Sequence, residues 1–425
     1  MDRQTCGSAT GEMIATLPLE SHSEGTVSLD GESRLPGRRS HLPNQGSCRQ
    51  ARRRAGQSGD QLGGGVLASL RDLVGDLKVT GVGGNAMAAQ GLESLHAMED
   101  ISLMGLDGVT EKLLKAIRIR KSLFNTFLND PPDVFLGIDI PDFNISLEER
   151  LKAHRIPTAH LVSPTVWAWR SYRIRKIRRS VDRMMVLFPF EETFYRLHGV
   201  SAKFVGHPAA DEIDQITRKQ AREKLTGEGL EVDRTTVALL PGSRRSEIDS
   251  LGRLFLDTAE RLAQVNAEIQ FILPVANTSV AQQLRDLVDT HKGGQNVFLT
   301  EQNARLAIAA ADVGLIASGT AALEAALLAR PMVVAYKVSR LSYLLARLFA
   351  KVRHVSMPNH LTAEPMVKEF LQDDANVDNQ CGEIQLVLTD KIYREKIEHA
   401  FQGLTGMLRN NASDTIAKEL IYMTD

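Results

Sequence analysis

The stretch Ile316-Ala-Ser-Gly-Thr-Ala-Ala-Leu-Glu324 joins an apolar strand directly to a run of helix formers. The turn between them, Ser318-Gly319-Thr320, places free backbone N–H groups at a helix start, where they and a hydroxyl can bind a diphosphate. Glu324 follows about one helical turn later, where its carboxylate can accept hydrogen bonds from both hydroxyls of a ribose. Taken alone, Glu324 fits a solvent-facing helix glutamate better.

A similar turn precedes it, in Ala238-Leu-Leu-Pro-Gly-Ser-Arg244. Gly242 and Ser243 can present backbone N–H groups, and the planar guanidinium of Arg244 suits phosphate oxygens. An ordinary strand-to-helix turn explains this stretch equally well. The two turns together favour a nucleotide-binding half-domain.

Around these turns, short apolar runs alternate with helical stretches, which is typical of a parallel α/β sheet. Residues 1–55 are rich in Ser, Gly, Arg and Gln, and we expect them to be disordered despite a short apolar patch at residues 13–19. The remainder is predicted to form domains at 56–208 and 209–385, followed by C-terminal helices at 386–425. The predicted strands cover residues 79–82, 134–139, 158–162, 184–188, 203–205, 236–240, 269–274, 297–300, 313–317 and 332–336.

The net charge and the motifs missing from the sequence exclude several classes of protein. The 425 residues carry a formal charge of −1, so no overall field favours nucleic acid. No P-loop, no Gly-x-Gly-x-x-Gly after a strand and no His or carboxylate cluster with metal-ligand spacing occurs. We therefore expect neither metal nor cofactor. No apolar window of about 18 residues is long enough to span a membrane.

Asp139 is the candidate catalytic residue of the first half, in Phe135-Leu-Gly-Ile-Asp-Ile-Pro-Asp-Phe-Asn144. An apolar strand delivers it to a carboxyl edge, and Pro141 ends the strand there. A carboxylate at that place can take the proton from an attacking sugar hydroxyl. Asp142 and Asn144 can orient it or bind sugar hydroxyls. The alternative is that these carboxylates merely cap the strand end.

Two further segments point to lipid or sugar contact. In His160-Leu-Val-Ser-Pro-Thr-Val-Trp-Ala-Trp-Arg170, Trp169 can stack on a sugar or an acyl chain and Arg170 can bind a phosphate, although packing of the indoles in the core is an equal alternative. Val109, Leu113 and Ile117 recur at helical spacing among basic residues, which is typical of an interfacial helix. Residues 339–353 repeat that pattern more weakly.

Taken together, these segments resemble one family, the lipid-A-disaccharide synthases. The matching stretches occur in family order from about residue 55 to the end: 56–65, 81–84, 104–105, 137–144, 163–170, 188–191, 206–208, 239–244, 317–324 and 358–359. The resemblance implies a GT-B-like α/β fold, with two Rossmann-like domains facing across a cleft. It also implies inverting transfer of a diacylglucosamine from UDP to lipid X, 2,3-diacylglucosamine 1-phosphate, by a peripheral enzyme on the cytoplasmic face of the inner membrane. A homo-oligomer is compatible with it.

The resemblance also assigns roles to residues. Asp139 would be the general base. Ser243, Arg244, Ser318, Gly319, Thr320, Glu324 and Asn359 would line the nucleotide-sugar site. Ser58, Gly59 and Asp60 would form the cleft-facing loop of the first half.

The chain departs from the family pattern near residue 57. Gln57 stands where the family has glutamate, and Gln50-Ala-Arg-Arg-Arg-Ala55 replaces an apolar first strand. Because three arginines cannot lie in a central buried strand, we predict that the first domain lacks its first strand. Two alternatives stay open: another UDP-sugar enzyme, such as an epimerase or a different GT-B transferase, and an inactive lipid-binding relative.

Overall fold

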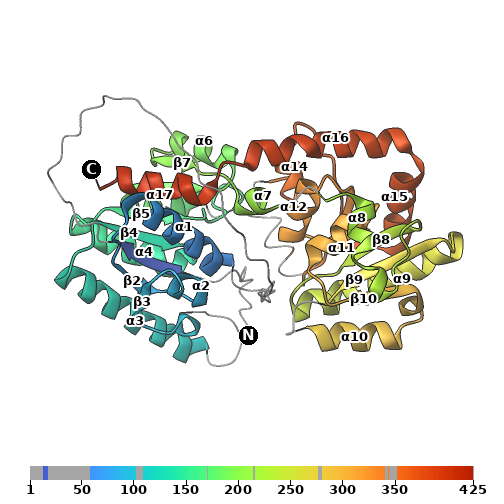
Figure 1. Cartoon of the computed structure of the whole chain (residues 1–425), viewed down its shortest axis with the longest axis horizontal. Helices are drawn as coiled ribbons and strands as arrows, with labels where there is room; N and C mark the ends of the chain where they lie inside the picture. Colours follow the sequence, from blue (N-terminus) through green and yellow to red (C-terminus); the bar gives the residue numbers. More distant parts are fainter. Residues whose placement is uncertain are drawn as a thin grey trace, which may run out of the picture.

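The computed structural model describes residues 13–17, 58–101, 109–169, 171–213, 216–275, 280–339, 343 and 352–424. These residues form two α/β lobes that lie side by side (Figure 1). Each lobe is built on one sheet, with strand orders β3-β2-β1-β4-β5-β6-β7 and β10-β9-β8-β11-β12-β13.

The sheet of the second lobe is parallel throughout. Its strands are β8 (Thr235–Leu240), β9 (Ile269–Pro274), β10 (Val297–Thr300), β11 (Val313–Ala317), β12 (Met332–Tyr336) and β13 (Lys368–Leu371). Five of them match predicted strands. The edge strand β13 was not predicted, because Lys-Glu-Phe-Leu has little apolar signal. The helices of this lobe are α8 (Arg218–Glu223), α9 (Arg245–Val265), α10 (Ala281–Thr290), α11 (Ala304–Ala310), α12 (Thr320–Leu327), α14 (Pro358–Leu361), α15 (Val377–Thr389) and α16 (Lys391–Leu408).

The first lobe holds β1 (Met13–Leu17), β2 (Val79–Val82), β3 (Leu92–Ser94), β4 (Val134–Ile138), β5 (Thr158–Leu161), β6 (Arg183–Val186) and β7 (Ala202–Phe204). We predicted that this lobe lacks a strand. That prediction is wrong, because β1 fills the central place in the sheet. Strand β1 runs antiparallel between β2 and β4, with Ala15 opposite both Gly81 and Leu136. Without it, both neighbours would have rows of unpaired backbone groups inside the sheet.

The predicted disorder of residues 1–55 is therefore also wrong for Met13–Leu17, and the rest of that prediction lies outside the described residues. Five residues that hydrogen-bond on both sides gain enough backbone pairing to offset the entropy of ordering them.

Helices cover both faces of the first sheet. On one face, α1 (Ser58–Val74), α2 (Asn85–Ala88) and α17 (Ala412–Tyr422) share a core with the side chains of Val134, Leu136 and Ile138. On the other face lie α3 (Val109–Asn129), α4 (Pro141–Ala153), α5 (Ile174–Ser180) and α6 (Pro189–Leu197). Phe135 points to this second face, as the alternation of side chains along a strand requires.

The chain passes between the lobes twice, once near α7 (Pro208–Glu212) and once between α16 and α17 (Figure 1). Asp211 joins the two crossings, because its carboxylate accepts hydrogen bonds from the backbone N–H groups of Asn410, Asn411 and Ala412 at 3.1, 3.1 and 2.7 Å. The C-terminal helix α17 thus belongs to the core of the first lobe, whereas α16 packs in the second.

Candidate active site

Asp139 follows the last residue of β4, at the carboxyl edge of the first sheet. It has a φ of 52° and Ile140 has a φ of 34°, so two consecutive residues adopt the left-handed conformation. A β-branched residue rarely does so, and such strain is often found at functional sites. The side-chain amide of Asn144 stabilises the turn by donating to the carbonyls of Asp139 at 2.8 Å and Ile138 at 3.2 Å. Asn144 therefore orients the Asp139 backbone.

A buried, hydrogen-bonded Glu–His pair lies beneath this turn and was not predicted. Glu148 Oε1 lies 2.7 Å from His160 Nδ1, and both side chains are fully buried. Burial raises the pKa of the Glu148 carboxyl, and His160 opposes that shift. A Cβ at Gly137 would come within 2.2 Å of Glu148 Oε1, so strand β4 needs glycine there. The spacing of four residues between Asn144 and Glu148 was the one feature of the sequence that could have placed Glu148 on the same helix face as Asn144.

Ser318, Gly319 and Thr320 lie where β11 ends and α12 begins. Gly319 and Thr320 are exposed, and a Cβ at Gly319 would meet no atom within 4 Å. The Ser318 hydroxyl donates to the carbonyl of Val355 at 2.9 Å, which ties this turn to the segment before α14. The turn thus keeps an open helix start, suited to an anion.

Glu324 lies on α12 and is held by an arginine from the neighbouring helix α11. Arg305 Nε donates to Glu324 Oε1 at 2.8 Å, and Arg305 Nη1 donates to Glu212 Oε2 at 3.2 Å. The Glu324 side chain is 21% exposed. Its carboxylate is therefore oriented by Arg305 rather than solvated freely, which the sequence did not indicate.

The turn before α9 differs from the prediction. Glu247 Oε2 accepts the backbone N–H groups of Ser243 at 2.9 Å and Arg244 at 3.3 Å, and its Oε1 lies 3.5 Å from Arg244 Nη1. These amides, predicted to face phosphate, are thus engaged by a carboxylate of the same helix. Arg244 itself keeps a side chain that is 44% exposed. The spacing of Arg244 and Glu247 is that of a capping box, a signal present in the sequence.

Asn359 also has a different position from the one predicted. Its side chain is buried, and its amide nitrogen donates to the carbonyl of Val367 and to Glu369 Oε1 at 2.9 and 2.8 Å. Glu369 Oε1 also accepts from the backbone and hydroxyl of Ser356 at 3.0 and 2.6 Å. Asn359 and the unpredicted Glu369 therefore position the segment that contacts Ser318.

Aromatic rings join the lobes at these carboxyl edges. Trp167, in the loop after β5, lies with its ring centroid 5.1 Å from that of His360 on α14 and 4.9 Å from that of Phe190 on α6. His360 is bonded to the carbonyl of His354, in the segment that Ser318 contacts. Strand β5 is also the neighbour of β4, which ends at Asp139. The loop that follows β5 therefore contacts α14, next to the segment that the Ser318 hydroxyl holds.

Two titratable groups flank this contact, the buried Glu191 and the partly buried His207. Burial raises the pKa of the Glu191 carboxyl to about 7, although hydrogen bonds from Ser163 and Phe188 act in the opposite direction and lower it. Burial also lowers the pKa of His207 to about 4, and its Nδ1 accepts the backbone N–H of Ala209 at 3.1 Å. His207 is therefore neutral at pH 7.

Asp60 is buried rather than facing a cleft. Its carboxylate accepts hydrogen bonds from the backbone N–H groups of Gly84, Ala86 and Met87 at 2.9, 2.8 and 3.1 Å. Its immediate role is to hold the loop before α2. Gly59 is buried beside it, and Ser58 is the first residue of α1.

The other predicted acceptor residues lie apart from this network. Asp142 is exposed and forms an ion pair with Arg173. Trp169 donates from Nε1 to the hydroxyl of Thr165 at 3.0 Å. Arg170 lies outside the described residues.

Helix α3 presents apolar side chains to solvent. Leu113, Leu114 and Ile117 are 50%, 53% and 44% exposed, whereas Ile119 and Leu123 pack into the core. Val109 is the first residue of this helix. In the described part of the chain, no helix is long and apolar enough to cross a bilayer.

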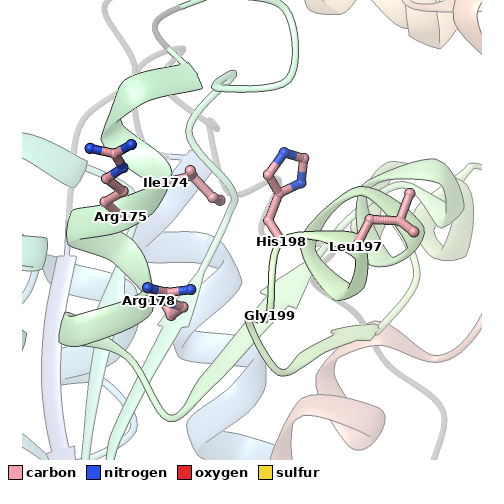
Figure 2. Close-up of a pocket in the computed structure, with 6 residues that line it drawn as sticks. All are labelled: Ile174, Arg175, Arg178, Leu197, His198 and Gly199. Carbon is pink, nitrogen blue, oxygen red and sulfur yellow. The ribbon is translucent and has the colours of Figure 1, made fainter.

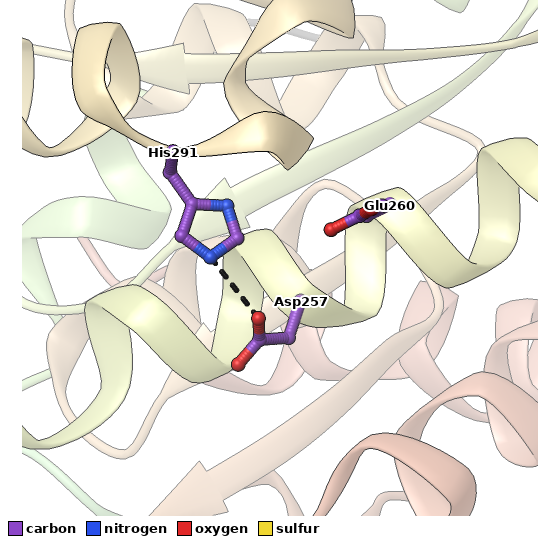
Figure 3. Close-up of side chains that lie close together, drawn as sticks. All are labelled: Asp257, Glu260 and His291. Atoms are coloured by element: carbon purple, nitrogen blue, oxygen red, sulfur yellow. Dashed lines mark hydrogen bonds and ion pairs between the residues drawn. The ribbon is translucent and has the colours of Figure 1, made fainter.

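One group of potential metal ligands occurs among the described residues, at Asp257, Glu260 and His291 (Figure 3). His291 Nε2 lies 3.0 Å from Asp257 Oδ1, and His291 Nδ1 accepts the backbone N–H of Gly293 at 3.0 Å. Both ring nitrogens are thus used within the protein. The group is best explained as a link between α9 and the turn after α10.

Comparison with known proteins identifies the family. The family model described as lipid-A-disaccharide synthetase matches residues 54–420. The lipid-A-disaccharide synthase of Alkalilimnicola ehrlichii is 43% identical over 86% of this chain and 95% of its own length, and that of Hahella chejuensis is 41% identical over 87% and 92%. This chain belongs to the lipid-A-disaccharide synthase family. It is therefore a glycosyltransferase, as the resemblance implied.

Solved structures confirm the GT-B-like fold of this family member. A putative UDP-N-acetylglucosamine 2-epimerase from Listeria monocytogenes superposes with a TM-score of 0.59 at 11% identity, covering 86% of this chain and 93% of its own. A glycosyltransferase from Rickettsia africae gives a TM-score of 0.52 at 9% identity, covering 86% and 96%. At such identities the likeness concerns the fold alone.

Proposed function

We propose that the protein transfers 2,3-diacylglucosamine from UDP-2,3-diacylglucosamine to the 6-hydroxyl of lipid X. The products are a β-1,6-linked disaccharide 1-phosphate and UDP. The observation that carries the proposal is the ring contact between Trp167 and His360, which links segments near the carboxyl edges of the two sheets. One of these edges carries Asp139 on a strained turn, and the other carries the open helix start at Gly319 and Thr320. Membership of the family supplies the substrate class.

In the proposed mechanism, the Asp139 carboxylate takes the proton of the acceptor 6-hydroxyl as its oxygen attacks C1 of the donor sugar. The bond from C1 to the diphosphate breaks on the opposite side, so the anomeric configuration inverts and UDP leaves. The N–H groups at the start of α12 and the Arg244 guanidinium stabilise the charge that develops on the diphosphate. Glu324, oriented by Arg305, accepts the ribose hydroxyls.

We place the enzyme on the cytoplasmic face of the inner membrane, held there peripherally by α3. The exposed leucines and isoleucine of that helix support this proposal, because large apolar side chains gathered on one helix face are typical of interfacial helices. Arg118 and Lys121, which are exposed on the same helix, add positive charge for anionic lipids.

The activity can be tested with purified full-length protein in detergent. We expect UDP release and a disaccharide 1-phosphate when UDP-2,3-diacylglucosamine and lipid X are both present, and a β anomeric proton in the product by NMR. Turnover of soluble UDP-N-acetylglucosamine without any reaction of the lipid pair would instead indicate an epimerase or another UDP-sugar enzyme. Vesicle binding without turnover of either substrate would indicate an inactive relative.

A further inference from the structure

A groove lies between α5 and α6 in the first lobe. Its outer part is a hollow of about 430 Å³ lined by Ile174, Arg175, Arg178, Leu197, His198 and Gly199 (Figure 2). An adjoining hollow of about 500 Å³ continues past Tyr172 and Phe194 to Trp167, the residue that contacts the second lobe. We call the two hollows together the α5–α6 groove.

The cations of this region divide into two sets. The first set is paired with side chains of α4. Arg173 forms an ion pair with Asp142, and Arg179 forms one with Glu149 at 3.4 Å. Lys176 donates a hydrogen bond to a serine hydroxyl of α4. Arg175 and Arg178 are exposed, line the groove, and have no ion pair or hydrogen bond to any described residue. The groove therefore holds two positive charges, three residues apart on one helix, that no described residue compensates.

Large apolar side chains lie beside these charges. Tyr172 is 73% exposed and Leu197 is 78% exposed, at the edges of the groove. Helices α5 and α6 cover the same face of the sheet as α3, with α4 packed against both α3 and α5. One face of the lobe thus combines unpaired arginines with exposed apolar groups, the composition of surfaces that bind anionic membranes.

We propose that the α5–α6 groove binds the phosphate-bearing headgroup of an anionic lipid at the membrane surface. Arg175 and Arg178 contact the phosphate, and Tyr172 and Leu197 enter the interfacial region beside it. The groove is then a second membrane contact, separate from the apolar face of α3. This inference rests on surface residues outside the transfer site, so it can fail while the transferase activity stands.

The test measures binding of the full-length protein to vesicles by co-sedimentation. Vesicles of phosphatidylethanolamine with phosphatidylglycerol are compared with vesicles of phosphatidylcholine alone. We expect R175E/R178E to weaken binding to the anionic vesicles by about tenfold or more, since each basic residue near such a surface contributes to attraction. R175K/R178K should retain most of the affinity.

The matched control is R253E/R261E, because these arginines are also exposed on a helix, in the second lobe, and the change in net charge is the same. It should bind within about twofold of the unmodified chain if the site, and not net charge, matters. Equal losses in the two double variants would overturn the proposal. So would binding of inorganic phosphate by the unmodified chain that R175E/R178E abolishes while binding to anionic vesicles stays unchanged, which would indicate a site for free phosphate.

Two further measurements keep the result interpretable. Thermal unfolding and activity on detergent-dispersed substrates should be the same for R175E/R178E and the unmodified chain. If the double charge reversal unfolds the lobe, R175Q/R178Q takes its place, and unchanged binding to anionic vesicles by that variant would contradict the proposal.

Discussion

The two lobes share one architecture but complete it differently. All the strands of the second lobe are parallel and lie within the stretch matched by the family model. The central strand of the first lobe lies outside that stretch, since the match begins at residue 54 and β1 is Met13–Leu17, and it is antiparallel to both neighbours. The comparison teaches that the place of a strand in a sheet can be filled by any segment able to pair on both sides.

The lobes also bury different polar groups. Among the described residues, the first lobe buries the carboxylates of Asp60, Glu148 and Glu191, whereas the second buries the guanidinium groups of Arg222 and Arg330. Arginine stays charged at all physiological pH values, but a buried carboxyl can titrate near neutrality. We therefore expect the first lobe to respond more strongly to pH.

The largest effect is expected from Ala15→Pro. Proline in a central strand removes a ladder hydrogen bond and leaves a buried carbonyl unsatisfied. The first lobe should lose several kcal/mol of stability, whereas the second lobe should not change. Hydrogen exchange measured peptide by peptide would show faster exchange in β2 and β4 but not in β8 and β11.

Ala15→Ser is the control for that variant, because it keeps the backbone N–H. Unchanged exchange in β2 and β4 of the proline variant would mean that β1 does not complete the sheet.

A smaller effect is expected from Glu191→Gln. The carboxyl has a pKa of about 7 in the folded protein and 4.5 ordinarily, so between these values the folded state binds more protons. Glu191 therefore contributes most stability below pH 4.5, and that contribution is lost as the pH rises through 7. The free energy of unfolding of E191Q relative to the unmodified chain should rise by at most about 3 kcal/mol from pH 5 to pH 8.

Chemical denaturation at several pH values measures this difference. Glu192→Gln removes a carboxylate from the adjacent position of α6 and serves as the control. A difference for E191Q that does not depend on pH would contradict the raised pKa.

The smallest effect concerns the buried pair beneath Asp139. His160→Leu should cost about 2 kcal/mol, because it leaves Glu148 buried without its partner. The double variant H160L/E148M should recover much of that loss, since two apolar groups need no hydrogen bond. Equilibrium unfolding of the three proteins measures the coupling, and a double variant less stable than the single one would contradict it.

Much of the fold could be predicted from the sequence. Buried parallel strands are near-continuous apolar runs, so those of the second lobe were predicted almost to the residue, apart from the polar edge strand β13. Strand β3 was missed because Leu-Glu-Ser is short and mostly polar. Strand β1 was missed because the isolated apolar patch at residues 13–19 gives no indication of its partners.

For the candidate site, the sequence predicted the places of some residues in the fold. Residues at strand ends, such as Asp139 and Ser318, follow from the rule that ligands bind at carboxyl edges. The contacts of Glu148, Arg305 and Glu369 do not follow from that rule, because these side chains contact residues distant in sequence or on other elements. Local sequence patterns indicate the sheet edge at which a functional side chain lies. Only the packing of helices and strands shows which other side chains contact it.

The most direct test of the account is the effect of Asp139→Asn on two quantities measured in one preparation. If Asp139 is the general base, kcat should fall by at least about a hundredfold, while the Kd for UDP should stay within about twofold, because the proposed nucleotide site lies in the other lobe. Retention of kcat by this variant would contradict the account. So would a parallel loss of UDP binding, which would mean that Asp139 supports the structure of the nucleotide site rather than the chemistry.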